Sequence, residues 1–414
     1  MNVFQTRLRL MVVASFVLLG ASAAHGDEVL DWNAILERTV APTPHFLQSR
    51  SAAIVQLAVF EAVNAIVGGY EPYLGTVDAP PWASPEAATV AAAHSTLLAL
   101  HPEAMALLDA ERADSLAAIT DGPGKDAGIA AGEAAADAIL SLRANDGWNV
   151  VVPYTPLSDP GYWRPTPPAF LPAAFVGWGD VTPFAIHDSA RFRLNPPPLL
   201  HTAKYAKDYE EVKALGGVIS TSRPADRADV ARFYAAVLPM PLWPAAARQA
   251  SAAHGKALSE NAREFAWLAM AVCDGLIASM KMKYHYSFWR PVTAIREADT
   301  DGNPQTIPDG GWESFVLTPP YPTYPGNHAT AAGAARAVLE HVYGLDGHLI
   351  TLTSQAVPDV VLQYTSWEQI TDDIDDARIY GGVHFRFDQS AGARLGRQVG
   401  TYVLQNMLRP VSGQ

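Results

Sequence analysis

A histidine at the start of an alanine-rich run is the first feature of this sequence that suggests chemistry. PTYPGNHAT occupies residues 322–330, and the alanine-rich residues that follow favour a helix. A helix start offers free backbone N–H groups and the positive end of the helix dipole, which suit an anion. Gly326 would let the backbone approach a ligand closely, and Asn327 is a favoured helix N-cap. His328 is therefore a candidate anion-site residue, although the stretch alone also fits an ordinary capped loop.

A second cluster, KYHYSFWRP at 283–291, adds two cations. Lys283 and Arg290 are seven residues apart, so on one helix they would share a face. Pro291 favours extended backbone at Arg290 and so places it at the helix end. The alternative is that two cations at a helix C-terminus complement the dipole. His285 lies between tyrosines and is expected to pack rather than to bind a ligand.

A third cluster, DDARIYGGVHFRFDQSAG at 375–392, pairs a histidine with a carboxylate. His384 and Asp388 are four residues apart, so on a helix Asp388 could hold one ring nitrogen and leave the other free. A nucleophilic or metal-ligating histidine needs that arrangement. The alternative is a surface pair that contributes about 0.2–0.5 kcal/mol. Arg378 adds a third cation, and the glycine pair before His384 suits close approach to a small ligand.

Helices must position these clusters. Nine segments are rich in strong helix formers, and no convincing alternating strand is found. Residues 144–200 are rich in proline and aromatic side chains and are expected to form an ordered connector over the helices. The expected helices are 48–66, 85–100, 103–119, 125–143, 224–237, 258–284, 328–343, 366–380 and 388–407.

Composition and charge limit the class of protein. The chain has 414 residues, 49% hydrophobic and 17% charged, which fits one large globular domain or two packed ones. A formal net charge of −13 disfavours nucleic acid or an anionic membrane as a partner, because both need basic surface. A bound anion must therefore be held by local positive charge. Cys273 is the single cysteine, so no internal disulfide can form.

The N-terminus is typical of an export signal. It has two arginines at 7–9, an apolar core at 10–19 and a small-x-small sequence at 24–26. We expect residues 1–26 to be a signal peptide and the mature chain to be periplasmic or secreted. A single membrane anchor is disfavoured because the apolar core is short. The later apolar stretch at 265–280 is interrupted by an aspartate and is expected to be a buried helix, not a membrane span.

The order and spacing of the three clusters resemble the signature of the type-2 phosphatidic acid phosphatase superfamily. That signature is Lys-x6-Arg-Pro, then Pro-Ser-Gly-His, then Ser-Arg-x5-His-x3-Asp. The first part is complete here, and the third has Ala377 in place of the serine. The second part keeps Pro325 and His328 but has Gly326 for serine and Asn327 for glycine. The firm resemblance covers residues 283–388.

Within that superfamily the chain is similar to the bacterial secreted branch of the vanadium-dependent haloperoxidases. PPYPTYP at 319–325 looks like the Pro-Pro-Phe-Pro-x-Tyr-Pro segment that precedes the family's histidine. AVFEAVNAI at 58–66 and WRPTPPAF at 163–170 look more loosely like segments of bacterial members. Together with the helix count, the resemblance predicts an all-α helical bundle of the haloperoxidase and acid phosphatase type, built of two packed bundle-like halves. We expect an N-terminal helical region with its connector over 27–200 and a site-carrying bundle over 201–414.

The resemblance also implies roles for individual residues. His384 would bond the vanadium of vanadate with Asp388 beside it, and His328 would be the acid–base catalyst. Tyr321 falls where chloroperoxidases of the family carry Phe and bromoperoxidases carry His, so it would lie in the halide pocket. The residues that would bind the oxyanion, vanadate or phosphate in its place, are Lys283, Arg290, Gly326, Asn327, Arg378 and His384.

Gly326 removes the serine hydroxyl that the family directs at the oxyanion. A hydrogen bond to a charged group contributes roughly 1.5–3 kcal/mol, so vanadate would bind about ten- to a hundredfold more weakly unless another donor replaces it. The side-chain amide of Asn327 is the replacement that the sequence suggests.

Three functions fit these residues. The favoured one is a vanadium-dependent haloperoxidase that oxidises halide, bromide rather than chloride, with hydrogen peroxide and passes it to an organic acceptor. The alternative is a soluble exported acid phosphatase with a phospho-histidine at His384. The third is an exported binding protein with a decayed site, which the retained charged residues disfavour because buried charges are costly. The sequence leaves the halide, the acceptor, the choice of vanadate or phosphate and the oligomeric state undefined.

Overall fold

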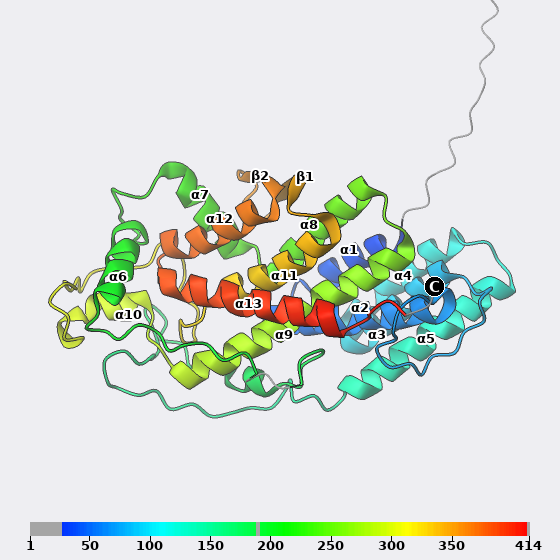
Figure 1. Cartoon of the computed structure of the whole chain (residues 1–414), viewed down its shortest axis with the longest axis horizontal. Coiled ribbons are helices and arrows are strands. Elements are labelled where there is room, and N and C mark those ends of the chain that lie inside the picture. Colours follow the sequence, from blue (N-terminus) through cyan, green and yellow to red (C-terminus); the bar gives the residue numbers. More distant parts are fainter. Residues whose placement is uncertain (1–26, 188–190, 412–414) are drawn as a thin grey trace, which may run out of the picture.

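The helices pack around one long central helix, α9, and run mostly along the long axis of the molecule (Figure 1). The computed structural model describes residues 27–187 and 191–411, so the expected signal peptide at 1–26 lies outside the described residues. The thirteen α-helices of the described part confirm the expected all-α class. They are α1 Glu28–Val40, α2 His45–Val67, α3 Pro85–Leu100, α4 Met105–Ala117, α5 Pro123–Arg143, α6 Ala203–Leu215, α7 Ala225–Ala236, α8 Pro239–His254, α9 Leu258–Tyr286, α10 Pro291–Arg296, α11 Asn327–Tyr343, α12 Trp367–Tyr380 and α13 Arg386–Asn406.

Two groups of helices share α9 as their common centre. On one side α2 packs against α9, with α3 and α5 behind it; on the other side α11 and α13 pack against α9 and against each other. At one end of the molecule lie α3, α4 and α5, and at the opposite end lie α6, α7 and α10 (Figure 1). Because both groups include α9, the expected division at residue 200 stays a prediction.

The central helices are apolar because they are buried on nearly every face. Among the described residues, α2 and α9 are long and apolar enough to cross a bilayer by length and composition alone. In the fold, 78% of the apolar window of α2 and 94% of that of α9 are buried inside the protein. The core helix of a soluble protein meets the same criteria, and the stretch at 265–280 is the buried helix that the sequence predicts.

Glycines allow α11 and α13 to approach each other closely. A Cβ atom on Gly396 would lie 1.9 Å from the carbonyl oxygen of Thr330, and one on Gly392 would lie 2.4 Å from that of Gly326. Any larger residue at these positions would push the helices apart. The close contact brings the first turn of α11 against the first turn of α13, where the predicted site residues lie.

The proline-rich connector at 144–200 packs onto the bundle wherever the structure describes it. Its Trp163 and Trp178 are buried. Asp274 of α9 accepts hydrogen bonds from three successive backbone N–H groups, those of residues 184–186, at 2.7, 2.7 and 3.0 Å. The aspartate that interrupts the apolar stretch of α9 therefore anchors the connector.

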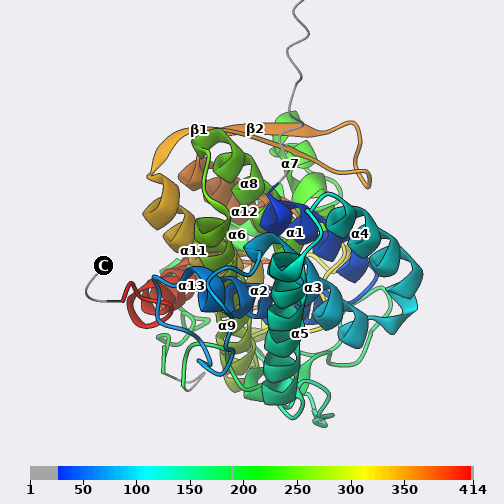
Figure 2. The same cartoon turned by 90° about the vertical axis from the view of Figure 1, so that its right-hand side faces the viewer.

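All nine expected helices form. The one expected at 103–119 is a short 3-10 turn followed by α4. Four helices, α1, α6, α8 and α10, were not expected, and the absence of strands was wrong. Strands β1 Asp346–Thr353 and β2 Val361–Ser366 pair antiparallel and lie across α8 and α12 (Figure 2). In β1 the inward side chains are His348, Ile350 and Leu352. Because His348 is polar and the apolar Leu349 faces outward at 77% exposure, the apolar period-2 signal is weak.

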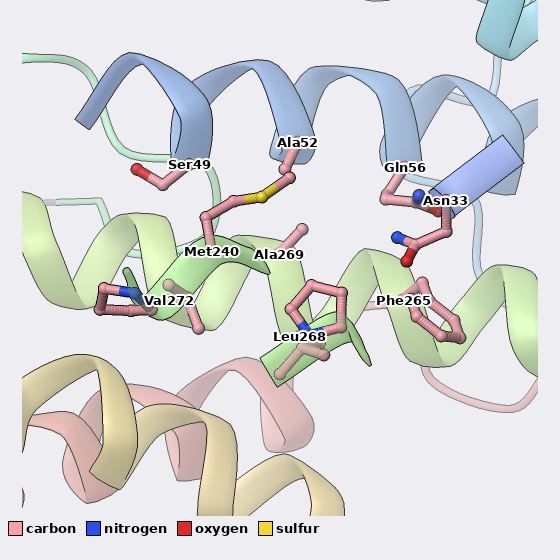
Figure 3. Close-up of a pocket in the computed structure, with 11 residues that line it drawn as sticks. Asn33, Ser49, Ala52, Gln56, Met240, Phe265, Leu268, Ala269 and Val272 are labelled. Carbon is pink, nitrogen blue, oxygen red and sulfur yellow. The ribbon is translucent and has the colours of Figure 1, made fainter. Parts of the chain in front are cut away.

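A small cavity lies between α1, α2, α8 and α9 (Figure 3). Its volume is about 20 Å³, which is room for one water molecule. Met240, Phe265 and Leu268 make most of its wall apolar, and none of the predicted site residues lines it. This cavity is therefore too small to be a substrate site.

Candidate active site

Three buried cations gather where α9, α10 and α12 end or begin. Lys283 lies in the last turn of α9, Arg290 just before α10, and Arg378 in the last turn of α12. Their exposed fractions are 0%, 0% and 3%. Arg290 is extended before Pro291, as expected, but it shares no helix with Lys283, because α9 ends at Tyr286 and Ser287 turns the chain with a left-handed φ of 48°. The turn, not a common helix face, brings Arg290 back towards Lys283.

Backbone carbonyls of the proline-rich loop hold two of these cations. Lys283 Nζ donates hydrogen bonds to the carbonyl oxygens of Pro322 and Thr323 at 2.9 and 2.7 Å. Arg290 Nε donates to the carbonyl oxygen of Tyr321 at 2.8 Å, and its Nη1 donates to a carbonyl of the 381–384 turn at 2.8 Å. Carbonyl dipoles satisfy these N–H groups but leave the positive charges in place.

The third cation depends on the hairpin that the sequence did not predict. Arg378 Nη1 donates to the carbonyl oxygen of Tyr234 in α7 at 3.3 Å. The Tyr234 and Tyr364 hydroxyls lie 2.9 Å apart, and the Tyr364 hydroxyl donates to Asp373 of α12 at 2.8 Å. These hydrogen bonds link α7, β2 and α12, and they hold in place the helix that carries Arg378.

No carboxylate of the described chain neutralises these charges by a direct ion pair. Arg290 Nη2 and Arg378 Nε are also buried without a hydrogen-bond partner. Burial, reinforced by the neighbouring Arg290, holds the pKa of Lys283 well below its usual value, and burial lowers the pKa of both arginines to about 10. Buried, unpaired cations are costly, so this cluster is suited to an anion that carries more than one charge.

Asp388 and Thr323 orient the ring of His384. Its Nδ1 lies 3.0 Å from Asp388 Oδ2 and 3.0 Å from Thr323 Oγ1, and Thr323 Oγ1 donates to the same Asp388 oxygen at 2.6 Å. A carboxylate acceptor assigns the proton to Nδ1 and leaves the lone pair on Nε2. Burial and the nearby cations lower the pKa of His384 well below its usual value. Its Nε2 lies 3.2 Å from Arg290 Nη1 and faces the cation cluster.

The predicted contact between His384 and Asp388 forms, but not on a helix. α12 ends at Tyr380 and α13 begins at Arg386, so His384 lies in the turn between them. Asp388 stands in the first turn of α13 and also accepts the backbone N–H of Phe385 at 2.9 Å. A turn closed by this carboxylate replaces the expected helical stacking.

His328 lies in the first turn of α11, as expected. Its Nε2 atom is buried without a hydrogen-bond partner, although the residue as a whole is partly exposed. Burial and the charge of Arg378 lower its pKa well below the usual value, with smaller contributions from His45 and Lys283. A neutral imidazole beside the cations is able to accept a proton.

The side chain of Asn327 is directed towards α9. Its Oδ1 accepts a hydrogen bond from Ser279 Oγ at 2.6 Å, and its Nδ2 reaches Met280 Sδ at 3.5 Å. The expectation that Asn327 is the helix N-cap is wrong, because α11 begins at Asn327 and Gly326 holds the cap position without a side-chain bond. The amide of Asn327 thus already has partners in the core.

Tyr321 forms an aromatic wall beside the cations. Its ring centroid lies 5.1 Å from the Arg290 guanidinium carbon and 5.4 Å from Lys283 Nζ. The rings of Phe46 and His45 lie 6.2 and 6.5 Å from it. Burial raises the pKa of Tyr321, so the phenol stays protonated.

Sequence reasoning missed three neighbours of this site. His45 opens α2, and burial together with the charge of Arg378 lowers its pKa to about 4. Thr323 lies inside the stretch that drew attention to His328, where a buried hydroxyl gives no pattern. Gln389 follows Asp388 directly and is fully buried. No spacing rule points to His45, since it reaches the site from the other half of the fold.

Comparisons with known proteins agree with this geometry. Residues 263–413 match the family model described as the VCPO second helical-bundle domain. The vanadium chloroperoxidase of Curvularia inaequalis is 32% identical over 94 residues, which are 20% of this chain and 15% of that protein. Residues 263–413 are thus similar to the second helical bundle of vanadium chloroperoxidases. The chain spans only 15% of that curated relative, so this match does not identify a particular activity.

Solved structures of vanadium-dependent haloperoxidases share the fold. A bacterial vanadium-dependent iodoperoxidase superposes with a TM-score of 0.78 at 24% identity, covering 92% of this chain and 96% of that one. A holo-type bacterial vanadium-dependent chloroperoxidase superposes with a TM-score of 0.70 at 17% identity, covering 87% and 91%. The expected haloperoxidase type of helical bundle is thereby confirmed.

The residues of this site fit a vanadate ion. The site offers three cations, two unpartnered arginine N–H groups and a histidine whose unprotonated Nε2 lies 3.2 Å from Arg290 Nη1 and faces the cations. Guanidinium and ammonium groups suit the oxygens of an oxyanion, and a neutral imidazole suits the metal. The same donors would also suit phosphate.

Proposed function

We propose that the protein is an exported vanadium-dependent haloperoxidase that oxidises a halide with hydrogen peroxide. The observation that supports this most is the buried group of cations without carboxylate partners, placed against the unprotonated Nε2 of a histidine. Lys283, Arg290 and Arg378 would hold the oxygens of vanadate, and His384 would bind the vanadium. Asp388 would keep the His384 proton on Nδ1.

The chain's own residues would supply binding, orientation and proton transfer. When bound, vanadate supplies the Lewis acidity that makes hydrogen peroxide electrophilic towards halide. His328, whose pKa is held well below its usual value, would take a proton at Nε2 from the incoming peroxide, then return it to the departing oxygen. The charges that lower its pKa are neutralised when an anion binds, which brings that pKa back towards the working range.

Bromide is the halide that we propose over chloride. The buried phenol of Tyr321 puts an aromatic face and a hydroxyl next to the cations, a wall that differs from the phenylalanine that chloroperoxidases of the family are expected to carry. The solved relatives include an iodoperoxidase and a chloroperoxidase, so iodide and chloride belong in the same assay.

The test is bromination of a monitored diketone by the mature chain with peroxide and bromide, before and after loading with vanadate. Activity should need vanadate and should be lost in His384→Ala but kept in His285→Ala, which changes an exposed histidine outside the site. The phosphatase alternative predicts the reverse: no bromination, and hydrolysis of a simple phosphate ester that vanadate inhibits. That result would overturn the haloperoxidase proposal.

A further inference from the structure

Gly326 and Gln389 occupy one small space between α11 and α13. Gly326 holds the N-cap position of α11, and its N–H donates to the carbonyl oxygen of Asp388 at 2.9 Å. A Cβ atom added to Gly326 would lie 2.6 Å from Gln389 Nε2, 3.0 Å from its Cδ and 3.1 Å from its Oε1. The amide of Gln389 therefore fills the place where a side chain of residue 326 would begin.

The amide of Gln389 is buried and has no partner. Its residue is 0% exposed, and both Nε2 and Oε1 lack a hydrogen bond within the described chain. An unsatisfied buried amide costs about 1–3 kcal/mol. Asp388, the preceding residue, supports the metal-binding histidine, so this amide belongs to the same turn of α13.

We infer that Gln389 is an oxyanion-binding residue whose Nε2 donates a hydrogen bond to the ion held by the cation cluster. The inference rests on the proposed function and adds a residue to its site. A serine at position 326 and this conformation of Gln389 exclude each other sterically. The glutamine amide thus takes over the donor that a glycine at position 326 cannot supply, while the Asn327 amide contacts α9 and Tyr321.

The experiment measures orthovanadate and inorganic phosphate binding by titration calorimetry, without peroxide or halide. Gln389→Met keeps the size of the side chain and removes the donor, so the vanadate dissociation constant should rise about ten- to a hundredfold. Gln389→Ala with Gly326→Ser makes room for a hydroxyl and should restore binding to within about threefold of wild type. Gln56→Met is the matched control, because Gln56 is also buried with an unpartnered side-chain oxygen but lines the small cavity of Figure 3.

Thermal unfolding separates a binding role from a structural one. Without an anion, Gln389→Met should unfold at the same temperature as wild type or higher, since no hydrogen bond is lost; the stabilisation by vanadate should shrink. Equal vanadate affinity in wild type and Gln389→Met would overturn the inference and leave the haloperoxidase proposal intact. A double variant no tighter than Gln389→Ala would also overturn it. Wild type that binds neither anion would refute the proposed function itself.

Discussion

Replacing Asp388 by asparagine should separate stability from activity. Asp388 Oδ2 accepts hydrogen bonds from Thr323 Oγ1, His384 Nδ1 and the Phe385 N–H, while Oδ1 has no partner. Burial raises the pKa of this carboxyl from 3.8 to about 6 in spite of those bonds. Asparagine keeps an acceptor oxygen in the same place but lacks the charge that steadies a positively polarised imidazole.

The size of the stability change follows from the raised pKa of Asp388. A rise from 3.8 to about 6 means that ionising Asp388 in the fold costs about 3 kcal/mol at pH 8. An asparagine NH₂ in the place of Oδ1 would itself lack a hydrogen-bond partner, which would destabilise the fold by about 1–3 kcal/mol. The anion-free Asp388→Asn variant should therefore be as stable as wild type at pH 8, or up to about 2 kcal/mol more stable. Under the proposed function, in which His384 binds vanadium, loss of the carboxylate beside it should lower halide oxidation about ten- to a hundredfold.

The stability difference between wild type and Asp388→Asn should depend on pH. Between pH 3.8 and about 6 the native carboxyl binds a proton that the unfolded one has released, so this group's contribution to stability falls as the pH rises through 6. The advantage of asparagine should therefore shrink by about 1 kcal/mol between pH 8 and pH 5. Urea unfolding at both pH values, with bromination of a diketone alongside, checks both parts. Destabilisation by more than about 2 kcal/mol at pH 8, or full activity, would refute the reasoning.

Two further predictions concern the helices that carry the site. His328→Ala removes a neutral proton acceptor but no cation, so halide oxidation should fall about a hundredfold or more while vanadate affinity changes much less. Steady-state kinetics measures the oxidation rate and calorimetry measures the affinity. An equal loss in both quantities would make His328 a binding residue instead. Gly396→Ala places a Cβ atom 1.9 Å from the Thr330 carbonyl oxygen and should destabilise the fold by about 1–3 kcal/mol. Gly310→Ala, where a Cβ meets nothing within 4 Å, is its control, and equal urea midpoints would contradict the close packing of α11 and α13.

The sequence predicted the helices whose own composition favours them. The long apolar α9 and the alanine-rich α11 are examples, since propensity and burial agree over their whole length. α8 carries Pro244 inside it, and α10 has six residues, so neither gives a clear helical pattern. The hairpin was missed because the inward His348 is polar and the outward Leu349 is apolar, which breaks the alternation of residue types in β1.

Spacing located the site residues but gave the wrong reason for their positions. Lys283 and Arg290 meet through a turn after α9, and His384 meets Asp388 through a turn before α13, although helical geometry was assumed for both. The roles drawn from the family signature stay predictions. Gln389 could not be recognised from the sequence, because its contact with Gly326 depends on two helices that pack through glycines.

The most direct test of the oxyanion site is the amount of vanadium that each chain retains. The mature protein would be loaded with orthovanadate, passed through gel filtration and measured for metal per chain, followed by the peroxide and bromide assay on the same sample. We predict about one vanadium per chain with bromination in wild type, and loss of both in Lys283→Met, which removes a buried cation while keeping an unbranched side chain. Wild type that retains no vanadium, or Lys283→Met that retains as much as wild type, would contradict the assignment of this buried cluster as the vanadate site.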